Sequence, residues 1–203
     1  MSATKLADLT ERLFAIFRHR SFLDMQGLAN EVPIFVQTYA PSDEDKMRDE
    51  TGHLVARLRA VGVGAQRLDL FDLVLDELEE SGLLAPLVED EKTFDKQDLF
   101  ETLVNYSSPR THLVPRLAKH MAAEGTQLTF ITGSGRVFPF LRTHTILESL
   151  QPQMVGHPVV IFFPGEYVQE LGGGSSLRLF GSIPSPTIVN PYYRAINLDT
   201  YRL

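Results

Sequence analysis

The 203-residue sequence contains no cysteine, which excludes disulfide bonds and thiolate metal sites. This lack suits the cytoplasm, where we expect the protein to work. The sequence also has no apolar run of the roughly 20 residues that a membrane span needs. Residues 6–17 are amphipathic and carry Asp8, Glu11 and Arg12, which is typical neither of a signal peptide nor of a membrane helix. We therefore expect no contact with a membrane.

Basic side chains are scarce, and they are unevenly distributed. The formal net charge is −7. Residues 1–127 carry −8, whereas residues 128–203 contain five arginines, no lysine and four acidic side chains. Nonspecific binding to duplex nucleic acid depends on a basic surface that displaces counterions. The composition therefore argues against direct nucleic-acid binding, although a local group of arginines can contact a phosphate or an acidic partner.

Complete nucleotide-binding motifs are also missing. The best candidate for a phosphate-binding turn is Gly133-Ser134-Gly135, which follows a short apolar run. A Walker A loop that starts at Gly133 needs a glycine at Phe138 and a lysine at Pro139, and a dinucleotide fingerprint also needs a glycine at Phe138. Ser134 lies outside any Gly-x-Ser-x-Gly nucleophile motif. We therefore interpret the segment as a bare turn, with anion binding as the alternative.

No two of the six histidines have the i, i+4 spacing of a helical metal site. His144 lies two residues after Arg142 and can line a cleft with it. A histidine in such a place is more often satisfied by a nearby carbonyl group. Because no set of metal ligands emerges from the sequence, we predict neither a metal nor a cofactor.

The most informative segment is Leu128–Leu150, which predicts a strand, a tight glycine turn and a helix with Pro139 near its first turn. A second apolar run, Pro158–Phe163, predicts another strand. Neither run alternates polar with apolar residues, so both strands should be buried on both faces. Strands of this kind are typical of the interior of a parallel sheet.

The remaining pattern alternates helices with strands. We expect helices over Lys5–Arg18, from about Ser42 to Val61, and over Phe71–Glu80, Gln97–Asn105 and Pro109–Glu124, the last kinked at Pro115. Further strands are expected over Pro33–Tyr39, Gln66–Leu70, Leu177–Phe180 and Tyr192–Leu198. This order predicts one α/β domain over residues 1–203. Its mostly parallel central sheet of about five strands would be flanked by helices, in a Rossmann- or P-loop-like layering without a Walker motif.

A parallel sheet would bring together the loops that follow its strands. These are Thr38-Tyr39, Asp69, Ser134-Gly135-Arg136 and Gly165-Glu166-Tyr167. In open α/β sheets, ligands bind at this carboxyl edge. The pattern therefore predicts where a binding surface lies, but it does not indicate a reaction.

Arg194 is a further candidate, next to Tyr193 in the last expected strand. An alternating strand would place Arg194 on the same face as apolar neighbours, where an unpaired charge is costly. Asp69 and Glu166 are candidate partners because both lie near strand ends. We favour a structural ion pair over a contact with an anion or a partner protein.

The second half of the chain contains the segments TGSGRVFPFLRTHTIL, PVVIFFPGEY, LRLF and NPYYRAINL, and the first half contains RSFLDMQGLANEVPIFVQTY and LDLFDLVLDEL. Together these segments resemble the BrxB family of bacteriophage-exclusion (BREX) systems, formerly a domain of unknown function. The resemblance covers nearly the whole chain. The glycine run 172–174 makes the connection between PGEY and LRLF longer than the usual one in that family.

The resemblance implies a role in phage defence beside other BREX components. These are a phosphatase-fold protein of the PglZ type, a large ATPase and an adenine methyltransferase. It implies no accepted catalytic mechanism. The PglZ-type protein is the partner that we expect first.

Three hypotheses of function remain. The first is a non-enzymatic interaction or scaffold component of a BREX-type system that binds a larger effector. The second is a degenerate nucleotide- or anion-binding domain, and the third is a hydrolase that uses Asp69, Glu166 and a metal. The candidate residues for contact with a partner or an anion are Ser134, Gly135, Arg136, Arg142, His144, Glu166, Tyr167, Tyr193 and Arg194.

Overall fold

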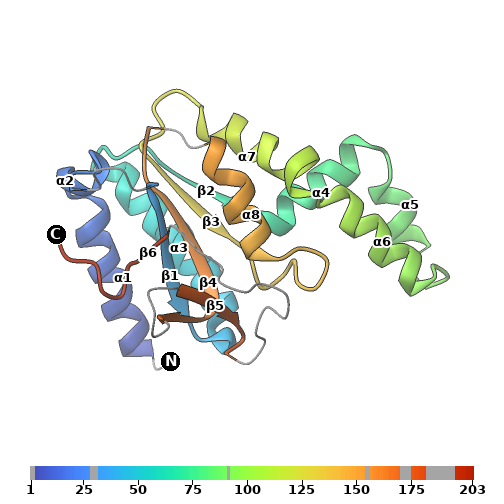
Figure 1. The fold of residues 1–203 in the computed structure, drawn as a ribbon, viewed down its shortest axis with the longest axis horizontal. Coiled ribbons are helices and arrows are strands. Elements are labelled where there is room, and N and C mark those ends of the chain that lie inside the picture. The colour runs from blue at the N-terminus through green and yellow to red at the C-terminus, as the bar shows by residue number, and fades with distance from the viewer. Residues whose placement is uncertain (1–2, 28–31, 91, 154–155, 170–174, 182–194) are drawn as a thin grey trace.

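The computed structural model describes residues 3–27, 32–90, 92–153, 156–169, 175–181 and 195–203. Within these ranges, six strands form one sheet with the order β2-β3-β4-β1-β6, and β5 pairs with the far end of β4 (Figure 1). The strands are β1 (Ile34–Tyr39), β2 (Ala65–Asp69), β3 (Leu128–Thr132), β4 (Val159–Gln169), β5 (Ser175–Leu179) and β6 (Ile196–Asn197). Neighbours along the order are parallel, whereas β5 is antiparallel to β4. The predicted α/β fold with a mostly parallel sheet is therefore confirmed.

Strands β3 and β4 are buried in the middle of the sheet, as their continuous apolar runs predict. All five residues of β3 are buried, and so are residues 159–163 of β4. The register pairs Phe130 with Val160 and Ile131 with Ile161. Because side chains alternate between faces, these two pairs project to opposite sides and contribute to separate cores.

Helices cover both faces of the sheet (Figure 1). They are α1 (Ala3–Phe17), α2 (Arg20–Leu23), α3 (Glu44–Ala60), α4 (Leu70–Glu80), α5 (Leu84–Glu89), α6 (Lys96–Tyr106), α7 (Val114–Met121) and α8 (Thr143–Leu150), with a π-helical turn at Pro109–Leu113. Helices α1–α3 pack on one face, and α4, α7 and α8 pack on the other. Helices α5 and α6 extend beyond α4, away from α1 (Figure 1). None of the described helices is both long and apolar enough to cross a bilayer.

The core beneath α1, α2 and α3 is rich in aromatic rings. The ring centroid of Phe17 lies 5.3 Å from that of Phe22 and 5.1 Å from that of Phe130. Phe130 also meets Phe162 edge to face at 5.3 Å. Phe17 and Phe22 are fully buried, and each such side chain stabilises the fold by about 1.5–3 kcal/mol. The N-terminal helix α1 is therefore docked on the body of the domain.

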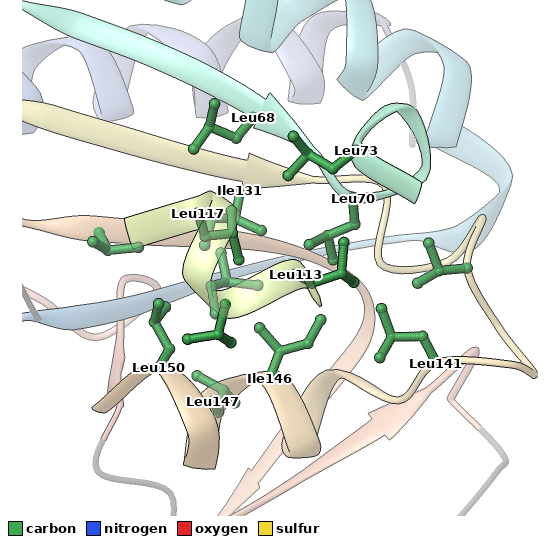
Figure 2. Close-up of a cluster of buried hydrophobic side chains, with 14 of the residues drawn as sticks. Leu68, Leu70, Leu73, Leu113, Leu117, Ile131, Leu141, Ile146, Leu147 and Leu150 are labelled. Carbon is green, nitrogen blue, oxygen red and sulfur yellow. The ribbon is translucent and has the colours of Figure 1, made fainter. Parts of the chain in front are cut away.

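The core on the opposite face is aliphatic. Figure 2 shows leucine and isoleucine side chains that converge from β2, β3, α4, α7, α8 and the adjoining loops: Leu68, Leu70, Leu73, Leu113, Leu117, Ile131, Leu141, Ile146, Leu147 and Leu150. Leu70 is fully buried and is the first residue of α4. Its burial fixes the point at which the chain leaves β2, and so places Asp69 at the edge of the sheet.

The segment after the glycine turn differs from the prediction. Residues 134–140 form a series of turns, and α8 begins only at Thr143. Side-chain contacts of Ser134 and Arg136 hold this segment against the sheet, and Val137 is buried in the aliphatic core. Because these tertiary contacts hold the backbone in turns, Pro139 lies in a loop and not in the first turn of a helix.

Strand β4 is longer than its apolar run predicts. The sequence predicts a turn at Pro164-Gly165, but β4 continues through it to Gln169 and pairs with β5. A Cβ atom on Gly165 would lie 2.1 Å from the carbonyl oxygen of Arg178. Glycine therefore permits the close approach of β5. The last expected strand is described only from residue 195 onward, where β6 covers Ile196–Asn197.

Candidate functional site

The carboxyl ends of β1, β2, β3 and β4 meet at one edge of the sheet, as predicted. Because these strands are parallel, Tyr39 of β1 lies opposite Pro164 of β4, and Asp69 of β2 lies opposite Thr132 of β3. The glycine turn begins directly after Thr132. This edge is the place where open α/β sheets usually bind ligands. Whether the protein's own side chains fill it bears directly on the hypothesis of anion binding.

The carboxylate of Asp69 is the centre of this edge. Its side chain accepts hydrogen bonds from the backbone N–H of Phe71 at 3.0 Å and from the hydroxyl of Thr132 at 3.1 Å. The first of these bonds caps the N-terminus of α4. Arg136 donates a further bond at 3.2 Å. With Asp69 only 5% exposed, the protein's own anion occupies the position that a ligand would need.

The glycine turn packs directly against this carboxylate. Gly133 has φ +79°, and a Cβ atom there would lie 2.4 Å from Oδ1 of Asp69. The backbone N–H groups of Arg136 and Val137 both donate to the carbonyl oxygen of Gly133. A phosphate-binding loop needs such groups to point outward, at the start of a helix. The turn does not open a helix, because α8 begins only at Thr143, and the carboxylate of Asp69 lies against it. Both features disfavour the binding of an anion there.

Ser134 has a structural role. Its hydroxyl donates a 3.0 Å hydrogen bond to the backbone carbonyl of Phe162 in β4, and the residue is 1% exposed. The pairing of β3 with β4 extends no further than Ile131 and Ile161. The Ser134 side chain therefore supplies a donor just beyond the end of the ladder and ties the glycine turn to the sheet.

Arg136 makes several contacts within the protein. Its guanidinium lies 3.2 Å from Asp69 and 3.6 Å from Asp72, and it stacks 4.5 Å above the ring of Phe71. Planar stacking combined with carboxylate pairing is the use to which arginine is best suited. Arg136 is one of the predicted contact residues, and its guanidinium is already paired with two carboxylates of this chain.

A second carboxylate adds negative charge to the same edge. The hydroxyl of Tyr39 donates a 2.6 Å hydrogen bond to Glu44. Burial raises the pKa of Glu44 above its ordinary value of 4.5, and the nearby negative charge of Asp69 raises it further. A Cβ atom on Gly135 would lie 2.8 Å from Pro164 and 3.2 Å from Glu44. The edge is therefore both acidic and closely packed, which disfavours a phosphate group.

Glu166 and Tyr167 lie in the part of β4 that pairs with β5, beyond the parallel sheet. Glu166 is exposed and stands opposite Arg178 in the register. The Tyr167 hydroxyl donates to the carbonyl of Ala195 at 3.1 Å, which anchors the start of the C-terminal segment. The predicted residues Tyr193 and Arg194 lie outside the described ranges. Asp69, one of the two partners suggested for Arg194, is already paired with Arg136.

Arg142 and His144 belong to a different surface. Arg142 lines a groove of about 630 Å³ between α6, the π-helical turn and the loop before α8. His144 is half-buried at the start of α8, and burial lowers its pKa. Sequence reasoning missed the opposite wall of this groove, which includes Val104 of α6. The spacing of Phe100 and Val104, four residues apart on α6, was the available signal.

Within the described ranges, no three His, Asp or Glu side chains are grouped so that they could hold a metal ion. Asp69 and Glu166, the residues of the hydrolase hypothesis, belong to different elements. Asp69 lies at the end of β2, whereas Glu166 lies in the β4–β5 hairpin. The contacts described at the sheet edge are hydrogen bonds and ion pairs within the protein.

Comparisons with known proteins agree on one family. A profile of the family described as BREX protein BrxB matches residues 66–198. A relative described as BREX protein BrxB from Bacillus cereus (strain H3081.97) is 30% identical over 182 residues, which cover 88% of this chain and 89% of the relative. A relative of the same description from Escherichia coli O9:H4 (strain HS) is 24% identical over 170 residues, which cover 80% and 84%. No solved structure gives a significant match.

Proposed function

The chain belongs to the BrxB family of BREX phage-defence proteins, and from this premise we propose that it is a non-enzymatic interaction component that binds a larger effector. The effector that we propose first is a PglZ-type phosphatase-fold protein of the same system. The large ATPase and the methyltransferase are the alternative partners. Residues 1–203 would act as one domain, because both buried cores share a single sheet. The lack of cysteine supports the cytoplasm as the place of action.

The observation that carries this proposal is the internal occupancy of the carboxyl edge. Asp69 fills the position beside Gly133, Arg136 neutralises it, and Ser134 bonds to Phe162. An anionic ligand would have to displace these bonds and approach Glu44 as well. The same features oppose the alternative of a degenerate nucleotide- or anion-binding domain. Because its own side chains fill the carboxyl edge, we propose that the chain acts through its outer surface.

Affinity purification from a complete BREX locus tests this function. We expect the tagged chain to retain the PglZ-type protein in a fixed ratio, and we expect isothermal calorimetry of the two purified proteins to reproduce the binding. A locus from which the gene for the PglZ-type protein has been deleted serves as the control, and there we expect the tagged chain to retain no other BREX component. If no BREX component is retained and the purified chain alone turns over a nucleotide or a phosphoester, the interaction function is refuted.

A further inference from the structure

The groove beside α6 is a hollow outside the carboxyl edge with an apolar floor. Val104, Phe140 and Leu141 supply apolar surface, and the hydroxyl and amide groups of neighbouring residues form a polar rim. Its volume of about 630 Å³ lies within the range of sites that hold small ligands or peptide side chains. One side is the π-helical turn Pro109–Leu113, a type of backbone that often occurs at functional sites. The groove is therefore large enough to receive part of another molecule.

Helix α6 extends this apolar surface toward solvent. None of its residues is buried in the described structure, although Leu99 and Leu103 pack against the aliphatic core. Phe100 is 36% exposed and Val104 is 38% exposed, and their spacing places them one turn apart on the same face. Helix α6 lies at the outer end of the molecule in Figure 1. A contiguous apolar surface of this kind, bordered by polar residues, is typical of a protein interaction site.

The charge at the groove is the opposite of the charge of the chain. No aspartate or glutamate is among the lining residues, although the chain as a whole carries −7. Arg142 is exposed, its guanidinium lies 5.6 Å from the ring centroid of Phe138, and no carboxylate pairs with it among the described residues. By contrast, the arginines at positions 57, 116 and 136 each have a carboxylate partner. The groove thus offers one stacked, available cation beside an apolar floor.

We propose that this groove binds a short segment of a larger partner protein in which an apolar side chain is followed by a carboxylate. The proposal rests on the interaction function given above and adds the surface and the chemistry of the segment. The apolar side chain would enter between Val104 and Phe140, and the carboxylate would pair with Arg142. Arginine presents a planar set of donors that matches a carboxylate with two parallel hydrogen bonds.

A second copy of this chain fits the groove less well than a different protein. A two-fold contact places the same surface on both subunits, so the surface must complement itself. This surface contains an unpaired arginine and no carboxylate. A two-fold contact would therefore bring like charges together and leave Arg142 without a partner. Charge complementarity instead favours an acidic segment from another protein.

Two substitutions in the groove and two matched controls test this proposal in the complete chain. Arg142→Glu reverses the available charge, and Val104→Asp places a charge on the apolar wall. Arg48→Glu and Val61→Asp make the same changes at exposed positions outside the groove. The affinity of each protein for the purified PglZ-type protein is measured by calorimetry at low and high salt. Melting curves of the free proteins confirm that each variant is folded.

We expect each groove variant to bind at least about tenfold more weakly, as is typical for an interface anchor, while both controls bind as the wild type does. Raising the salt concentration should weaken the binding of the wild type but not that of Arg142→Glu, because salt screens the proposed attraction between Arg142 and the carboxylate, which the variant lacks. If all variants bind equally, the groove is not the docking site, although the interaction function stands. If the wild type binds no BREX component, both proposals fail together. Dimers that Arg142→Glu dissociates would identify a second copy as the occupant and overturn the assignment to another protein.

Discussion

At the scale of single residues, one carboxylate links three parts of the fold. Asp69 caps α4, bonds to the end of β3 through Thr132 and pairs with Arg136 in the following turn. Hydrogen bonds to a buried charged group contribute more than neutral ones, and the loss of one partner leaves the group unsatisfied. Asp69 thus contributes more to stability than a surface carboxylate does. Substitutions that disturb its contacts should lower the free energy of unfolding.

Gly133→Ala should destabilise the protein much more than Gly62→Ala. Both glycines have positive φ, +79° and +84°, where a side chain costs about 1–2 kcal/mol. The added Cβ at Gly133 would lie 2.4 Å from Asp69, whereas the Cβ at Gly62 meets no atom within 4 Å. The difference in the free energy of unfolding, measured with urea, isolates the contact with Asp69. Equal losses in the two variants would show that Asp69 moves away at no cost.

Glu44→Gln should stabilise the protein at neutral pH and have little effect in acid. Burial raises the pKa of Glu44, Asp69 and Asp45 raise it further, and Tyr39 and Arg136 oppose the shift. A carboxyl group with a raised folded-state pKa contributes stability that is complete below its ordinary pKa of 4.5 and is lost as the pH rises through the raised value. Glutamine stays uncharged and still accepts the hydrogen bond of Tyr39.

Melting curves of both proteins between about pH 4 and about pH 7.5 measure this effect. We expect the two melting temperatures to agree at the acidic end and to diverge in favour of the variant as the pH rises. A wild type that is more stable than the variant at neutral pH would mean that the ionised Glu44 is stabilised by its neighbours, contrary to this account.

At the scale of elements, the hairpin of β4 and β5 depends on a single glycine. Gly165 stands opposite Leu179 in the antiparallel register, close to the carbonyl of Arg178. The parallel part of β4 is held on both sides by β1 and β3, whereas residues 165–169 of β4 pair only with β5 among the described residues. Strands with one neighbour open more easily than central ones. The hairpin should therefore separate without loss of the sheet.

Gly165→Ala should open the hairpin and leave the parallel sheet intact. The added Cβ would lie 2.1 Å from the Arg178 carbonyl, so β5 must move away from β4. Hydrogen exchange should then show faster exchange for the amides of β5 and unchanged protection for those of β1. Gly156→Ala is the matched control, because its Cβ meets no atom within 4 Å. Full protection of β5 in Gly165→Ala would contradict the close approach.

At the scale of the whole molecule, the carboxyl edge is filled, whereas the groove beside α6 is open. The carboxyl edge is filled by Asp69, Arg136 and Glu44, while the groove beside α6 leaves Arg142 available. The acidic first part of the chain reduces nonspecific contact with nucleic acid. Arg142 therefore does not belong to a general basic surface. Under the proposed function, the groove and not the carboxyl edge would therefore contact the partner protein.

Magnesium-ATP should not stabilise the protein against heat. A ligand that binds the folded state and is present at 100 times its dissociation constant stabilises that state by about 2.7 kcal/mol. The carboxylate of Asp69 lies directly against the glycine turn, and its negative charge repels a phosphate group, so we expect no shift in the melting temperature at millimolar nucleotide. The purified effector, added in excess as the positive control, should raise it. A nucleotide-dependent rise that Arg136→Gln abolishes would reinstate the anion-binding hypothesis.

Local patterns in the chain were sufficient for the α/β class, the buried parallel strands and the edge where their loops meet. These features depend on residues that are close in sequence. A continuous apolar run indicates a strand that is buried on both faces, and the turn residues after it indicate where the strand ends. The strand order, the bonds of Asp69 and the groove beside α6 depend on residues far apart in sequence, such as Asp69 with Arg136 and Val104 with Arg142. No spacing rule relates such pairs. Only the folded chain, in which Ser134 and Arg136 are held at the sheet edge before α8 begins, decided that the glycine turn is closed and that the available arginine lies elsewhere.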